Sequence, residues 1–343
     1  MIIKNKNSKS SLNLGIELLR IIMCFWVILY HCFDTNNKKI KKIIKFKRFH
    51  VPTFMFISFY YFYNNLNTRN ISKIKMRLIR HSIPYIIWPT IIWIFNNIKY
   101  IIFQTNRFNR RLTLTELIYQ LTFGIKIYGI IWFNNILLLF IIFFTLISLI
   151  FKKKFLLIFQ IISILVYAFD YSKYRPKITK SYTWIFLGRV LGMFPISVTG
   201  LFLSSLNIIS KLKIDKNRNK AILICFLNIL FLFKYDIFII NRGYVYRSIL
   251  FNIAAINFFI FFSLVPFEKI KNKFVITFIK IITKYTGGIY YIHMIVKKNL
   301  YKKIDLINNK TVYGCIIIYL ISYFICFIGI IIFGKTIIRN LFC

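Results

Sequence analysis

The stretch CIIIYLISYFICFIGIIIF, residues 315–333, contains 19 residues and no charged side chain. Two further apolar runs are Trp132–Phe151 and Ala221–Phe233. A helix rises about 1.5 Å per residue, so about 20 apolar residues span the hydrocarbon core of a bilayer. These runs therefore predict a protein whose helices cross a membrane.

Apolar spans of this kind can be drawn along nearly the whole chain. The first, Leu12–Phe33, is too long for the apolar region of a signal peptide, so it is interpreted as a retained helix. A short segment, Leu112–Phe123, is interpreted as a helix at the membrane interface. We therefore expect an all-α, polytopic integral membrane protein with about ten transmembrane helices, in which residues 1–343 form a single domain and no separate soluble domain exists. The predicted spans are about residues 12–33, 50–64, 82–103, 128–151, 155–169, 184–206, 220–240, 247–265, 274–296 and 312–335.

The charge of the chain is strongly basic, with 49 Lys and Arg residues against 8 Asp and Glu residues and a net charge of +41. Nearly all of the basic residues fall in short loops, which favours a membrane surface over nucleic acid as their partner. A composition rich in Lys, Asn, Ile, Phe and Tyr is also what an AT-rich genome favours, so both explanations stay open. The loops on the two sides carry similar numbers of basic residues, so the positive-inside rule does not orient the chain.

Several kinds of site have no pattern in the sequence. The six cysteines lie mostly in apolar runs and form no C-x-x-C pair, which favours buried thiols that act as small apolar side chains. No nucleotide-binding loop, H-E-x-x-H motif or zinc-spaced cluster is present, so no metal is expected. A G-x-S-x-G elbow is also absent, which argues against a hydrolase-like serine mechanism.

The first span carries a stripe of polar residues, Asn13, Glu17, Arg20, Cys24 and His31. Eleven steps of about 100° separate Arg20 from His31, which places both on one face and about 16 Å apart along the axis. Glu17 lies three residues before Arg20, within reach for an ion pair. A stripe of this kind needs a bundle interior or a wet cavity. The alternative is that Glu17 and Arg20 form a strut between helices and that His31 is an interfacial residue.

The Arg-x10-His pattern in GIELLRIIMCFWVILYH, residues 15–31, resembles the signature of the acyltransferase 3 family of membrane-bound O-acyltransferases, many of which act on cell-surface polysaccharides. In the second helix the family's Ser-Gly-aromatic pattern is replaced by Ser58 followed by Phe59, and the absent glycine removes a close backbone approach. Further blocks resemble the family in order: HVPTFMFISFYYF (50–62), RLIRHSIPYIIW (77–88, similar to an arginine-rich loop that enters the third helix), IWFNNILLLFIIF (131–143), GRVLGMFPISVTGLFL (188–203) and TGGIYYIHMIV (286–296).

The resemblance implies an enzyme that transfers an acyl group, expected to be acetyl, from a thioester donor to a sugar hydroxyl of a cell-surface glycan. His31 is then the candidate general base or transient acyl acceptor, because an imidazole titrates near neutral pH. Arg20 would stabilise developing negative charge or hold the donor, and Glu17 would orient Arg20. Acetyl-CoA, or another acyl-CoA, is expected as the donor substrate, and no bound cofactor is expected.

The same blocks suggest further site residues. Arg77 and Arg80 are candidates to hold the phosphates of coenzyme A, and the alternative is that they bind lipid headgroups. Lys280 and Lys284 are expected to reach the membrane interface. Other candidates for the wall of a cavity are His293, which could instead be a packing residue, Arg189, which could instead reach the interface, Ser58 and Trp132.

Two alternatives to the enzyme stay open. One is a transporter or flippase for a glycan or a lipid-linked sugar, which should show inverted repeats or paired broken helices. The other is an inactive membrane scaffold of the same fold. In each case membrane lipids are expected partners, nucleic acid is not, and the cell membrane is the expected location; acyl-CoA and a glycan acceptor are partners of the enzyme alone.

Overall fold

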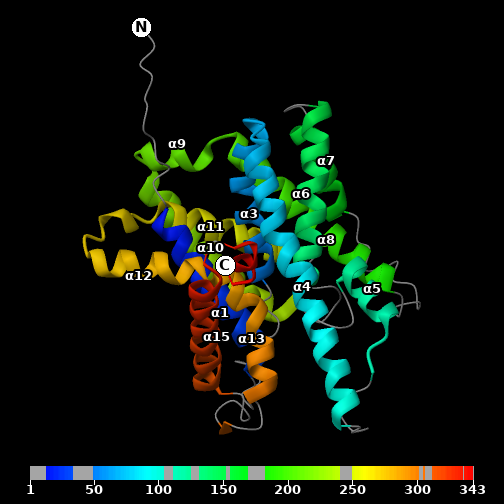
Figure 1. The fold of residues 1–343 in the computed structure, drawn as a ribbon. Helices are drawn as coiled ribbons and strands as arrows, with labels where there is room; N and C mark the ends of the chain where they lie inside the picture. Colours follow the sequence, from blue (N-terminus) through cyan, green and yellow to red (C-terminus); the bar gives the residue numbers. More distant parts are fainter. Residues whose placement is uncertain are drawn as a thin grey trace.

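The computed structural model describes residues 13–33, 49–103, 111–124, 131–151, 155–168, 182–239, 249–300, 304–305, 311–334 and 336–342. Every regular element within these ranges is a helix, as the sequence predicted (Figure 1). The α-helices are α1 (Leu14–Cys32), α3 (His50–Asn67), α4 (Ile71–Phe103), α5 (Leu114–Phe123), α6 (Trp132–Phe151), α7 (Phe155–Ala168), α8 (Tyr182–Ser205), α9 (Ile208–Ile214), α10 (Arg218–Ile239), α11 (Ile249–Leu264), α12 (Lys273–Lys284), α13 (Thr286–Leu300) and α15 (Val312–Phe333). Two short 3-10 helices are η3 (Phe267–Lys269) and η4 (Ile337–Leu341).

Several of the helices are long and apolar enough to cross a membrane. Within the described ranges, five meet this condition, and they are Leu14–Cys32, Ile71–Ile102, Trp132–Phe151, Ile185–Ser205 and Val312–Phe333. Two shorter apolar helices are Phe155–Val166 and Ile249–Leu264. These helices support a membrane protein, but the number of about ten spans is not confirmed. Part of the difference between ten predicted spans and five long helices comes from helix length. The predicted span 274–296, for example, is divided between helices of 12 and 15 residues.

The predicted span 274–296 is wrong as one continuous helix. It consists of α12 and α13, and Tyr285 between them caps α12 by donating its backbone N–H to the carbonyls of Ile282 and Thr283. Figure 1 shows α12 lying across the direction of α13. Two glycines, Gly287 and Gly288, follow the break, and glycine is a poor helix former. The hydropathy of residues 274–296 gives no sign of this change of direction, so the apolar run was predicted as one helix.

The arginine-rich block 77–88 is also different from the expectation, because it is helical rather than a loop. Helix α4 begins at Ile71, and the Asn70 side chain caps it by accepting the backbone N–H of Lys73 at 3.0 Å. Pro84 and Pro89 both lie inside this helix. Arg77 and Arg80 therefore lie one turn apart on a regular helix, which fixes their relative direction better than a loop does.

Helix α1 lies against α3, α11, α12, α13 and α15. An aromatic core on one side of it joins α3, α6, α8 and α11 through Phe59, Phe140, Phe194 and Phe259. Helices α3 and α8 approach closely at Gly200, where a Cβ atom would lie 2.9 Å from the carbonyl oxygen of Phe56. This packing holds α1 in the interior, with its polar stripe facing other helices.

Candidate active site

A cavity of about 890 Å³ lies between α1, α3, α4, α6, α12, α13 and η4. Its wall includes five of the residues that the sequence suggested, namely Glu17, Arg20, Ser58, Arg77 and Arg80. His31, His293, Arg189 and Trp132 do not line it. The structure therefore brings the candidate donor-binding residues together and places the candidate base elsewhere.

The cavity wall is strongly cationic. Glu17 is the single carboxylate among the residues that line it. The cationic side chains come from four separate elements, and they are Arg20, Lys73, Arg77, Arg80, Lys280, Lys284 and Arg339. Walls with an excess of one charge focus the electrostatic field and attract ligands of the opposite charge. The cavity is therefore suited to an anion with several charges.

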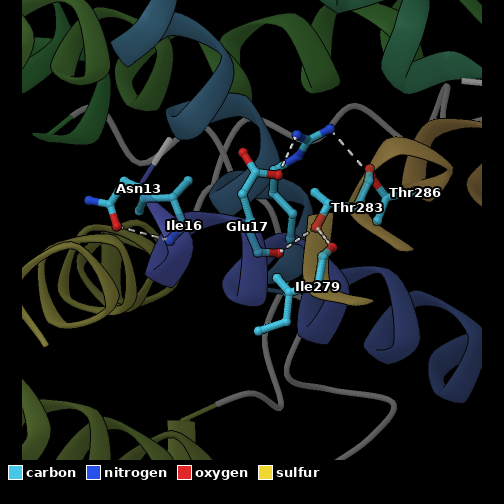
Figure 2. A network of polar contacts seen from close by, with 7 residues as sticks. Asn13, Ile16, Glu17, Ile279, Thr283 and Thr286 are labelled. Atoms are coloured by element: carbon cyan, nitrogen blue, oxygen red, sulfur yellow. Dashed lines mark hydrogen bonds and ion pairs between the residues drawn. The ribbon is translucent and has the colours of Figure 1, made fainter. Parts of the chain in front are cut away.

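Glu17 and Arg20 form an ion pair at the edge of this cavity, as their spacing predicted. Arg20 Nη1 lies 3.2 Å from Glu17 Oε2, and Arg20 Nη2 donates to Thr286 Oγ1 at 3.3 Å. Thr286 Oγ1 in turn donates to the carbonyl of Thr283 at 2.9 Å. Figure 2 shows Glu17, Thr283 and Thr286 gathered at the junction of α1 with α12 and α13. The break between α12 and α13 thus holds the guanidinium in place.

The polar stripe faces neighbouring helices, with Asn13 against α11 and the other four residues against α12 and α13. Asn13 donates to the carbonyl of Ser263 at 3.4 Å, and Cys24 contacts the carbonyl of Thr286 at 3.5 Å. Lys297 Nζ donates to the carbonyl of His31 at 2.5 Å. The stripe predicted from the helical period is therefore confirmed as an interior face.

His31 lies at the far end of this face, beside His293. The two ring centroids are 5.6 Å apart. His293 is buried, and its Nδ1 lies 2.8 Å from the carbonyl of Tyr290, which assigns the proton to Nδ1 and leaves Nε2 as the acceptor. Between Arg20 and His31, Cys24, Val27 and Ile28 are each at most 1% exposed. The two ends of the stripe are therefore separated by packed side chains as well as by about 16 Å of helix.

Arg77 is fixed by α3, whereas Arg80 is more exposed. Arg77 Nη2 donates to the carbonyl of Ser58 at 2.6 Å, and its guanidinium lies 5.0 Å from the centre of the Phe62 ring. Ser58 therefore lines the cavity and also holds Arg77 through its backbone oxygen. One turn later, Arg80 lines the cavity with its side chain open to it.

Arg189 and Trp132 contact each other outside the cavity. The guanidinium carbon of Arg189 lies 4.7 Å from the centre of the Trp132 ring, and Trp132 is 7% exposed. This arrangement is a cation–π contact between α8 and α6. It joins two helices of the aromatic core.

Several cavity residues were not assigned to a site from the sequence. Lys280 and Lys284 were expected to reach the membrane interface, but the structure places them on the cavity wall. Their spacing of four residues puts both lysines on one face of α12, and this spacing can be seen in the sequence. Lys73 and Arg339 carry no local pattern that marks a site. Within the described ranges, no group of three or more His, Cys, Asp or Glu side chains could hold a metal ion.

Comparison with known proteins gives one match. The model of a family described as an acyltransferase domain matches residues 13–335. No curated protein and no solved structure matches the chain.

Proposed function

Because the chain belongs to this acyltransferase family over residues 13–335, we propose that it is a membrane-bound O-acyltransferase that moves an acetyl group from acetyl-CoA to a sugar hydroxyl of a cell-surface glycan. The observation that carries the proposal is the cationic cavity in which Arg20 is held by Glu17 and Thr286. A coenzyme A thioester carries several phosphate charges, and this wall offers charges of the opposite sign from four elements.

The donor phosphates are assigned to the α4 side of the cavity. The guanidinium groups of Arg77 and Arg80 can each form two parallel hydrogen bonds to a phosphate. The first turn of α13, with Thr286 and Gly287 in the wall, presents the positive end of a helix dipole, and Lys280 and Lys284 offset the negative end of α12 beside it. These features favour a bound anion over a cation or an apolar ligand.

The distance along α1 separates the roles of Arg20 and His31. A group that stabilises the oxyanion must lie about 3 Å from the reacting oxygen, and so must the base that takes the hydroxyl proton. With about 16 Å of helix between them, Arg20 and His31 cannot both act at one acyl carbon. Of the two roles open to Arg20, we therefore assign it to holding the donor, and we assign the acyl chemistry to His31.

In the proposed reaction, His31 accepts the proton of the sugar hydroxyl as the hydroxyl oxygen attacks the thioester carbonyl. The C–S bond then breaks, and the coenzyme A thiolate leaves and takes up a proton. The long flexible arm of the donor would run beside α1 and α13, with the glycan arriving from the His31 end. This route requires movement of the side chains that pack around Cys24 and Val27, since the cavity does not extend to His31.

The test is mass spectrometry of surface glycans from a strain that lacks the gene. We expect the acetyl mass increments to disappear and to return when the wild-type gene is restored. Restoration with Arg20→Ala or with His31→Ala should fail, whereas Arg111→Ala, an exposed arginine outside the cavity, should restore acetylation. Full acetylation with both Arg20→Ala and His31→Ala would overturn the proposal.

A further inference from the structure

The segment Thr336–Phe342, which follows α15, lies outside the part of the chain that the family model matches. It contains η4, which lies against α4 and α15. Arg339 of this segment lines the cationic cavity, and its side chain is exposed to it. Among the described residues, its guanidinium forms no hydrogen bond or ion pair. It is therefore a charge in the cavity without a partner in the described structure.

Phe342 holds this segment in a socket between three helices. Its ring stacks on Phe333 with centroids 5.7 Å apart and meets the edge of Trp88 at 6.4 Å. A Cβ atom at Gly329 would lie 2.6 Å from the Phe342 ring, and one at Gly288 would lie 2.5 Å from the Phe342 carbonyl oxygen. The ring and the backbone thus each occupy space that a glycine leaves open.

One short turn links this anchor to the cavity. The backbone N–H of Phe342 donates to the carbonyl of Arg339 at 3.0 Å, and the N–H of Arg339 donates to the carbonyl of Thr336 at 3.2 Å. Leu341, between the two side chains, is 4% exposed. A rigid turn whose end is fixed in a socket holds Arg339 with less freedom than an unanchored segment would.

We propose that Thr336–Phe342 completes the anion site, with Arg339 as a further residue that binds a phosphate of the donor and Phe342 as its positioning residue. This inference rests on the proposed function and extends it. The α4 guanidinium groups hold one part of the donor, and Arg339 holds another phosphate from the α15 side. The cavity then selects a donor with more than one phosphate group. A phosphate could also come from a lipid headgroup, and the two sources are separated below.

The test is a titration of the purified full-length protein in lipid nanodiscs with coenzyme A. Arg339→Ala should weaken binding about tenfold, because one charge-assisted hydrogen bond is lost. Arg339→Lys should recover part of the affinity, and Arg111→Ala should leave it unchanged. Phe342→Ala should also weaken binding, whereas Phe324→Ala, which removes an exposed aromatic ring of α15, should not.

Three further measurements distinguish positioning from a general loss of structure. The double variant Arg339→Ala/Phe342→Ala should bind no more weakly than Arg339→Ala alone, since Phe342 acts through Arg339. Arg339→Ala and Phe342→Ala should also lower the salt dependence of binding by the same amount. Gly329→Ala places a methyl group against the Phe342 ring without touching a cavity residue, and it should reproduce the effect of Phe342→Ala.

The outcomes separate this proposal from the proposed function. If Arg77→Ala abolishes binding while Arg339→Ala binds as the wild type does, the role of Arg339 is overturned and the acyltransferase proposal stands. If the wild type itself does not bind coenzyme A, the proposed function is overturned. Arg339→Ala could weaken coenzyme A binding in nanodiscs that contain phosphatidylglycerol but not in nanodiscs made only of neutral lipid. In that case Arg339 binds the phosphate of a lipid, and its contact with the donor is overturned.

Discussion

The rings of His31 and His293 lie with their centroids 5.6 Å apart, on helices that are neighbours in space and 262 residues apart in sequence. The register of these helices is defined by two contacts, Arg20 with Thr286 and His31 with Lys297, which both join residues 266 apart. Helices α1 and α13 therefore run parallel. Because of this register, the proposed sites of donor binding and of acyl chemistry lie at the two ends of one interface between helices.

We expect the two histidines to act as a unit. His31→Ala should lower acyl transfer by at least about 10²-fold, because the proposed general base is lost. If His293 orients His31, the double variant His31→Ala/His293→Ala should be no slower than His31→Ala alone. Donor binding should be unchanged in His31→Ala, in His293→Ala and in the double variant, since neither ring lines the cavity.

A buried imidazole outside the cavity provides the control for this series. His50 is 2% exposed, and His50→Ala should cost stability without the loss of turnover. If the loss of rate in the double variant equals the product of the losses in the two single variants, His31 and His293 act independently, which would contradict their coupling.

The role of Glu17 as the hydrogen-bond partner of Arg20 can be separated from the effect of its negative charge. Glu17→Gln keeps an oxygen that accepts from Arg20, so coenzyme A should bind as tightly as to the wild type or slightly more tightly. Glu17→Ala removes the partner at 3.2 Å and should weaken binding about two- to fivefold, as expected for a partly exposed ion pair. Titration of both variants measures this difference. Tighter binding to Glu17→Ala would mean that Glu17 only repels the donor and does not orient Arg20.

The polar stripe of α1 was predictable from the sequence because the helical period is a local property. Glu17, Arg20 and His31 share a face in any regular helix, and the structure confirms that face as interior. The resemblance also named Arg77, Arg80 and Ser58, and the structure places all three on one cavity.

Other features depend on packing that no local pattern encodes. The gap between the cavity and His31 is filled by Cys24 and Ile28, which belong to one buried cluster with residues from other parts of the chain. Lys280 faces the cavity because α12 turns away from α13, and an apolar run gives no axis direction. Arg339 reaches the site only because η4 docks against α4 and α15.

The residue that replaces the family's glycine after Ser58 should be needed for stability. Phe59 is fully buried, and its ring lies 5.4 Å from Phe144 and 6.2 Å from Phe140. Phe59→Gly should therefore destabilise the protein by roughly 3–5 kcal/mol, as large-to-small core substitutions do. Thermal unfolding in detergent measures this loss, and Phe59→Leu should lose less. An unchanged melting temperature with faster acyl transfer would show instead that Phe59 impairs the site.

Gly200 provides a close approach between the backbones of α3 and α8. A Cβ atom there would lie 2.9 Å from the Phe56 carbonyl oxygen and 3.2 Å from the Tyr60 backbone nitrogen. Both neighbours are backbone atoms, which cannot move without shifting a helix. Gly200→Ala should therefore lower stability by about 1–3 kcal/mol, in the range of overpacked cores.

The substitution Gly200→Ala should also affect the cavity, because it would shift α3. Ser58 lies between the two backbone contacts of Gly200, and its carbonyl accepts from Arg77 at 2.6 Å. A shift of α3 would therefore displace this bond, and we expect Gly200→Ala to weaken coenzyme A binding in the fraction that stays folded. Thr199→Ala is the matched control, because the Thr199 hydroxyl donates to the Pro195 carbonyl of its own helix and, among the described residues, to no other helix. If Gly200→Ala leaves both the melting temperature and donor affinity at the values of Thr199→Ala, the contact between α3 and α8 does not position Arg77.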